Sequence, residues 1–199
     1  MNVRVHVANQ MLNDSVFNMD VEINRDAREI MAQKEGAAFV NGDGVSKPLG
    51  LLQATGVADF NTGVANDITG DAVLEVQGQL KEGYNPAYML NCRTLAKIRI
   101  MKGGNGQYLF APAAGDLPAT IGGDPYFVAN DMPNVDAGTT PIIYGDFGMA
   151  YVIVDNLQMT LIRDPYTLAG KNMTRFIFSK RVAGSVVLPE ALVKVKCAA

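Results

Sequence analysis

The chain has very few of the side chains on which most catalytic and metal sites depend. Its 199 residues include one histidine, His6, and two cysteines, Cys92 and Cys197. A single histidine excludes a histidine-rich metal cluster, and we expect His6 to lie at the surface or at the edge of a core. The cysteines are far apart and form no CxxC pair, which favours a reduced intracellular compartment over a disulfide framework.

Common catalytic and phosphate-binding motifs are also missing. The chain has four serines: Ser15, Ser46, Ser179 and Ser185. None of them lies in a GxSxG sequence, and no histidine stands near Cys92 to activate its thiol. Gly42-Asp43-Gly44 before Lys47-Pro48 lacks the GxxxxGK[ST] spacing of a phosphate loop, so we interpret it as a helix cap followed by a rigid turn.

Two further groups of residues have a structural interpretation. Gly122-Gly123-Asp124-Pro125 is typical of a turn before a strand, because glycine permits positive φ. Asp146, Asp155 and Asp164 stand near the ends of expected strands, where carboxylates more often cap turns than bind metal. We therefore expect no catalytic, cofactor-binding or metal-binding residues, no small-molecule ligand and no enzymatic activity.

Charge and hydropathy exclude other classes of protein. The formal net charge is −3, and the largest basic group, Arg93, Lys97, Arg99 and Lys102, is interpreted as one helix face with its flank. Specific nucleic-acid binding is not expected, because a phosphate-binding surface needs more clustered Lys and Arg. No apolar run approaches the ~18 residues of a membrane span, and the N-terminal sequence lacks the layout of a signal peptide.

The composition supports a folded chain whose first long element is a helix. With 48% hydrophobic and 19% charged residues, the chain can form one compact domain or two small ones. Alternation over Val3 to Val7 predicts a strand. Asn13-Asp14-Ser15 is a candidate N-cap cluster, and apolar spacing predicts a helix over about 15–40. Such a helix would be about 39 Å long, which suits a scaffold strut better than a compact core. Asn41 to Gly44 would end it with a left-handed glycine cap.

The rest of the chain alternates short helices and strands before it becomes rich in strands. The stretch 45–69 is expected to be a loop with short strands, and 103–123 to be flexible. Helices are expected over 71–81 and 93–102. Strands are expected over 88–91, 126–129, 141–144, 150–154, 159–163, 175–182 and 192–195. This order predicts an α+β fold and not a regular βαβ alternation.

Several short motifs, taken in order, resemble one family. They are Glu35 to Gly44, Lys47 to Leu52, Tyr108-Leu109, Gly123 to Tyr126, Ile143 to Phe147 with Tyr151 to Asp155, Arg163 to Thr167, and Lys180 to Gly184 with Pro189 to Ala191. Together they are similar to the major capsid proteins of tailed phages and prophages, over about Val3 to Lys196. The resemblance implies the Hong Kong ninety-seven-type capsid fold, with a long spine helix, a peripheral domain and an axial domain.

The resemblance also implies a division of the chain. The peripheral domain would comprise 1–48, with the spine helix at about 15–40, and 142–184. The axial domain would comprise 49–141 and 185–199, with the loop 103–123 near the five-fold and six-fold axes. Family members usually carry an N-terminal arm and a β-hairpin loop before the spine helix, so this chain resembles a member truncated at its N-terminus. Some members cross-link a loop lysine to an asparagine, and Asn172 could lie near that acceptor region.

The function implied by the resemblance is that of a structural shell subunit. Many copies would assemble, through pentamers and hexamers, into an icosahedral shell around DNA. Scaffold, portal and protease proteins would be further partners, and the location would be the virion, with the host cytoplasm during assembly. One alternative is an encapsulin-like nanocompartment shell. An alternative of another class is a small α+β hydrolase or ligand-binding domain.

Overall fold

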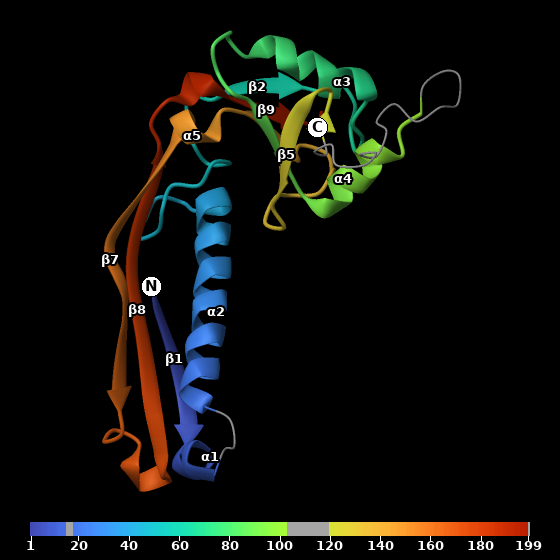
Figure 1. Cartoon of the computed structure of the whole chain (residues 1–199). Helices are drawn as coiled ribbons and strands as arrows, with labels where there is room; N and C mark the ends of the chain where they lie inside the picture. The colour runs from blue at the N-terminus through green and yellow to red at the C-terminus, as the bar shows by residue number, and fades with distance from the viewer. Residues whose placement is uncertain (15–17, 103–119, 199) are drawn as a thin grey trace.

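The computed structural model describes residues 1–14, 18–102 and 120–198. It consists of two parts that meet at an angle, an elongated limb and a more compact lobe (Figure 1). The limb contains a three-stranded sheet and the long helix, and the lobe is built on a six-stranded sheet. The α+β class predicted from the sequence is therefore confirmed.

The sheet of the limb is antiparallel, in the order β1-β8-β7. Its strands are β1 (Asn2–Ala8), β7 (Tyr151–Asp164) and β8 (Met173–Val186). Alternation along β1 turns the side chains of Val3, Val5 and Val7 to one face, where they meet Phe176 and Phe178 of β8. The sequence thus predicted β1 correctly. Apolar and polar residues alternate along this strand because only one face of the sheet is covered.

Helix α2 (Met19–Asn41) covers that face. Ile23, Ala27 and Met31 recur every four residues and are all buried against the sheet. At 23 residues the helix is about 34 Å long, and it runs along the limb (Figure 1). The expected strut is therefore present.

The predicted start of the helix was wrong. Asn13 and Asp14 end a separate short helix, α1 (Asn9–Asp14), while Ser15 lies outside the described residues. Helix α2 begins after Asn18, which has the extended backbone of an N-cap residue although its side chain makes no capping hydrogen bond. Tertiary packing of the apolar stripe, and not side-chain capping, sets where α2 begins.

Helix α2 ends in a close contact between backbones. Gly42 has a φ of −63°, so the predicted left-handed cap was wrong; the positive φ falls on Gly44 instead. Glycine is required at 42 for lack of space, because an added Cβ would overlap the carbonyl oxygen of Pro48. Gly50 N–H donates to the Gly42 carbonyl over 2.9 Å, which fixes the chain as it turns into the lobe.

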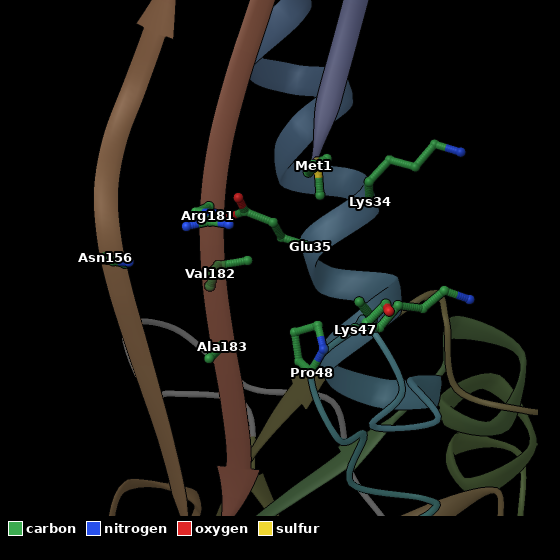
Figure 2. Close-up of a pocket in the computed structure, with 11 residues that line it drawn as sticks. Met1, Lys34, Glu35, Lys47, Pro48, Asn156, Arg181, Val182 and Ala183 are labelled. Carbon is green, nitrogen blue, oxygen red and sulfur yellow. The ribbon is translucent and has the colours of Figure 1, made fainter.

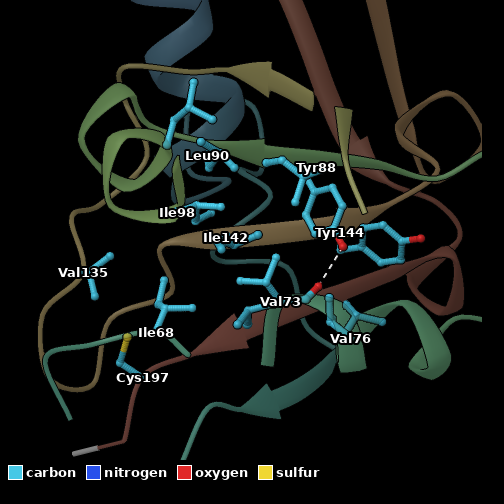
Figure 3. Close-up of a cluster of buried hydrophobic side chains, with 14 residues drawn as sticks. Ile68, Val73, Val76, Tyr88, Leu90, Ile98, Val135, Ile142, Tyr144 and Cys197 are labelled. Carbon is cyan, nitrogen blue, oxygen red and sulfur yellow. Dashed lines mark hydrogen bonds between the residues drawn. The ribbon is translucent and has the colours of Figure 1, made fainter. Parts of the chain in front are cut away.

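The sheet of the lobe has the order β2-β9-β6-β3-β5-β4. The strands are β2 (Ala58–Asn61), β3 (Ala87–Leu90), β4 (Thr120–Ile121), β5 (Asp124–Val128), β6 (Ile142–Gly145) and β9 (Leu192–Lys196). Three helical segments, α3 (Gly70–Glu75), η1 (Val76–Gln79) and α4 (Cys92–Arg99), pack on one face of this sheet. The core between them includes Tyr88 and Tyr144, and Tyr88 donates a hydrogen bond to the carbonyl of Val73 in α3 (Figure 3).

The opposite face of the lobe sheet meets the end of α2. Ile143 and Leu192 pack there with Val40 and with Leu51 of the following turn. Lys194, which is 8% exposed, donates to the carbonyl oxygens of Leu52 and Ala54. The lobe is therefore tied to the end of α2 by apolar packing, and the buried lysine holds the segment that follows the helix against the lobe sheet.

Several predicted boundaries need correction. The helix expected over 71–81 ends earlier, because η1 continues α3 with a tighter winding through Gly78. The strands expected over 150–154 and 159–163 are one strand, β7, with register shifts between Asp155 and Thr160. Strand β6 lies between β9 and β3 in the lobe and not in the limb. Most of the loop expected over 103–123, including Tyr108-Leu109, lies outside the described residues.

We expect Gly42→Ala to lower the free energy of unfolding by about 1–3 kcal/mol, because the new methyl group would overlap the Pro48 carbonyl. Urea unfolding followed by circular dichroism measures this change. Gly170→Ala is the matched control, since nothing lies within 4 Å of its added Cβ and it should change stability by less than about 0.5 kcal/mol. Equal stability of the two variants would contradict the role given to the contact.

Candidate interaction surfaces

The residues considered for chemistry are not brought together by the fold. His6 is exposed on β1 and pairs across the sheet with Arg175. Cys92 is exposed at the start of α4, and Cys197, the residue that follows β9, is buried. Across the described ranges, no three His, Cys, Asp or Glu side chains are grouped as a metal site would require. Among the helices that the structure describes, none is both long and apolar enough to cross a membrane.

The aspartates near strand ends have separate structural roles. Asp146 caps α5 (Phe147–Ala150) by accepting a hydrogen bond from the Met149 N–H. Asp155 forms an ion pair with Lys180. Asp164 ends β7 at the far end of the limb, where it accepts hydrogen bonds from Thr167 and Arg175. Two of the three therefore shape a turn or cap, as predicted, and the third bridges two strands.

The glycine pair at 122–123 forms the β4–β5 turn, as the sequence predicted. Both residues have positive φ, of 61° and 100°. The following Asp124 accepts hydrogen bonds from the hydroxyl of Tyr144 and from the side-chain amide of Gln77. Burial raises the pKa of Tyr144, and the hydrogen bond to Asp124 raises it further. This turn holds the sheet to η1, and both hydrogen bonds end on the same carboxylate oxygen of Asp124, Oδ2.

A groove of about 560 Å³ lies between α2 and β8 (Figure 2). Its lining comprises Met1, Lys34, Glu35, Ala38, Ser46, Lys47, Pro48, Asn156, Arg181, Val182 and Ala183. Glu35 points from α2 towards β8, whereas Lys34 and Lys47 extend away from that strand (Figure 2). Ser46, Lys47 and Pro48 of the predicted turn form one wall of this open groove, and the nearby glycines Gly42 and Gly44 do not line it.

An ionic bridge through Glu35, which lines this groove, joins the long helix to the sheet. Lys180 Nζ on β8 lies 2.9 Å from Glu35 Oε2 and 3.6 Å from Asp155 Oδ2. The hydrogen bond from Lys180 to Glu35 raises the pKa of Lys180. Both side chains of the shorter pair are largely buried, so removing either would leave a charge poorly solvated. The bridge therefore fixes α2 on the sheet midway along the limb.

Strand β7 presents an exposed apolar surface. Val152, Val154 and Ile162 face away from α2, because their partners on β8 alternate with the buried Phe176 and Phe178. Val154 and Ile162 are each 56% exposed. β7 is also an edge strand, so its outer backbone groups have no strand partner in the described chain. A long, exposed, apolar edge strand is typical of a surface that another chain covers.

Sequence inspection did not identify this surface. The run Tyr151 to Val154 predicts a strand, but a sequence pattern does not tell whether both faces of a strand are buried. The sequence feature that could have indicated this surface is the run of three apolar residues, Val152, Ile153 and Val154. A sheet that is packed on one face only must leave some of them exposed.

One family model and two solved structures match nearly the whole of this chain. The model of the phage capsid family matches residues 2–197. The solved capsid of an empty GTA particle is 32% identical, with a TM-score of 0.91, and the match covers 100% of this chain and 73% of that one. The capsid of the native GTA particle is 31% identical, with a TM-score of 0.90 and coverages of 100% and 72%.

A more distant similarity concerns the fold alone. The SrpI encapsulin from Synechococcus elongatus is 18% identical, with a TM-score of 0.71, and the match covers 98% of this chain and 72% of that one. A search of curated proteins finds no match.

Protonation of Asp164 in acid should lower the stability of the fold at the far end of the limb. Hydrogen bonds from Thr167 and Arg175 hold the pKa of Asp164 well below its usual value, so its ionised form stabilises the fold at neutral pH. This stabilisation should be lost as the pH falls below about 4, where the unfolded state takes up a proton first. We expect Asp164→Asn to be less stable than the wild type at neutral pH, and the difference to shrink on acidification.

Thermal unfolding across a pH series measures this effect. Asp131→Asn is the matched control, since the exposed Asp131 side chain accepts no hydrogen bond within the described chain. A stability difference for Asp164→Asn that does not change with pH would contradict the ionic explanation.

Proposed function

Since the chain belongs to the phage capsid family, we propose that it builds the icosahedral head shell of a tailed phage or prophage and that this shell encloses DNA. Membership makes it a capsid shell subunit, and not an enzyme. The alternative of a small hydrolase or ligand-binding domain is therefore wrong. The observation that carries the proposal is the 32% identity to the GTA capsid over the whole of this chain, together with a TM-score of 0.91.

We assign the limb to the peripheral domain and the lobe to the axial domain of the fold. One expected boundary has to move for this assignment. A cut before residue 142 would divide the lobe sheet, because β6 pairs with both β3 and β9. We therefore place the axial domain at about 49–145 and 187–199, and the peripheral domain at 1–48 and 146–186.

The work of such a protein is association. Capsid structures are assembled from copies of their subunit, and closed symmetry limits the growth of repeated contacts. The exposed strand β7 supports a role for the limb in these contacts, because a neighbouring copy that covered it would bury its apolar area. Pentamers and hexamers, contacts with scaffold, portal and protease proteins, and assembly in the host cytoplasm belong to the same proposal.

The encapsulin-like alternative rests on weaker similarity. At 18% identity the SrpI match supports the fold and not the contents of the shell. The GTA capsids are nearly twice as similar in sequence, so a phage-type capsid shell is the better supported function.

One set of experiments can measure both the assembly of this chain into particles and the contents of those particles. We expect the chain, expressed alone or together with phage scaffold and protease proteins, to form closed particles of uniform diameter by electron microscopy. Particles formed in the phage context should protect DNA from added nuclease. A chain that stays monomeric in sedimentation under every condition would contradict the shell, and particles that retain enzymes but no DNA would support the encapsulin-like alternative.

A pair of substitutions on β7 tests the role of the limb. We expect Val154→Glu with Ile162→Glu to prevent particle formation while leaving the unfolding temperature nearly unchanged, because both side chains are 56% exposed in the single chain. Gln53→Glu, at an exposed position of the lobe, is the control and should assemble normally. Normal particles from the β7 variant would show that this face stays outside the subunit contacts.

A further inference from the structure

We propose that the basic face of α4 binds the acidic face of α3 on a second copy of this chain. The proposal deepens the proposed function and rests on it, because it names one of the contacts through which copies associate. Both helices belong to the lobe and lie away from the limb (Figure 1). They pack on the same face of the lobe sheet.

Helix α4 exposes cations and no anions. Arg93 and Lys97 are one turn apart, and both are exposed, as are Ala96 and Ile100 on the same stripe. Thr94, Leu95 and Ile98 form the buried stripe. The outward face of α4 is therefore a row of two cations that ends in Ile100, which is 66% exposed.

Helix α3 exposes the opposite charges at the same spacing. Asp71 and Glu75 are four residues apart and exposed, with the 44% exposed Leu74 between them. Ala72 and Val73 form the buried side. Since residues four apart lie about 6 Å from each other on any α-helix, the two acids of α3 can face the two bases of α4 at matched distances.

These charges are not neutralised within the described chain. Of the ion pairs formed by the described residues, none involves Arg93, Asp71 or Glu75. Among the described residues, Lys97 Nζ donates a hydrogen bond to the carbonyl of Asn66, and the nearby Arg99 donates to the neutral hydroxyl of Tyr126. A partner chain can therefore form ion pairs with these side chains without breaking any ion pair that the described residues already form.

The partner that fits best is another copy. The acidic and basic rows are both present on this chain, so every copy supplies what its neighbour needs. Exposed Leu74 and Ile100 would add apolar contact within a charged surround, as in protein interfaces generally. DNA would satisfy the cations of α4 but would be repelled by the acids of α3, which lie on the same face of the lobe.

Charge reversal and charge exchange test the contact. The α4-reversed variant carries Arg93→Glu and Lys97→Glu, the α3-reversed variant carries Asp71→Lys and Glu75→Lys, and the exchanged variant carries all four. We expect each reversed variant to raise the critical concentration for particle assembly by at least about tenfold, because like charges then face each other. The exchanged variant, and an equimolar mixture of the two reversed variants, should assemble nearly as the wild type does.

A control separates the contact from net charge. Lys34→Glu with Lys171→Glu changes the net charge as the α4-reversed variant does, but at exposed positions of the limb, and should leave the critical concentration nearly unchanged. Thermal unfolding of every variant identifies any that fail to fold. A second measurement mixes isotope-labelled and unlabelled wild-type chains and treats them with a carbodiimide; Lys97–Glu75 cross-links between labelled and unlabelled peptides are expected.

The outcomes distinguish this contact from the proposed function. Wild-type particles together with an α4-reversed variant that assembles equally well would overturn the contact and leave the shell intact. Failure of charge exchange to restore assembly, or absence of intermolecular cross-links in the wild type, would also overturn it. Normal particles of the α4-reversed variant that lose their nuclease-protected DNA would mean that α4 binds DNA. A wild type that never forms particles contradicts the proposed function, while its cross-links at high concentration still report on the contact.

Discussion

The backbone contact of Gly42 with Pro48 and Gly50 determines how the two parts of the molecule are joined. No side chain fits between these segments, so the end of α2 and the turn after it approach to hydrogen-bonding distance. Val40 and Leu51 on either side of this contact then reach the face of the lobe sheet that carries Ile143 and Leu192. The direction of α2, and with it the position of the whole limb sheet, follows from a contact of a few atoms.

The lobe and the limb differ in how much of their apolar surface is buried within the chain. In the lobe, one face of the sheet is covered by α3 and α4, and the other by the junction with α2. In the limb, α2 covers one face and leaves the other to solvent, with β7 at the edge. A subunit that buried all its apolar strands would gain stability, but it would have less apolar surface to bury on association.

Local patterns allowed the elements of the fold to be predicted, but not their assembly. The alternation of β1 and the apolar stripe of α2 are strong signals, because each reflects packing on a single face. The start of α2 was misjudged because Asn13 and Asp14 have high capping propensity, yet belong to another helix. The positions of β6 and of the buried Lys194 depend on pairings between distant segments, which no local pattern reports. The family motifs predicted the function, while the exposed surfaces became visible only in the folded chain.

The length of α2 makes the position of the far end of the limb sensitive to the geometry of the junction. Because the helix spans about 34 Å, a rotation of only about 5° at Gly42 would move its far end by about 3 Å. The ion bridge of Lys180 with Glu35 keeps helix and sheet together, so the limb would move as one lever and would not bend in its middle. The contact between Gly42 and Gly50 therefore has to hold α2 closely, because any error in the direction of the helix is enlarged over the length of the limb.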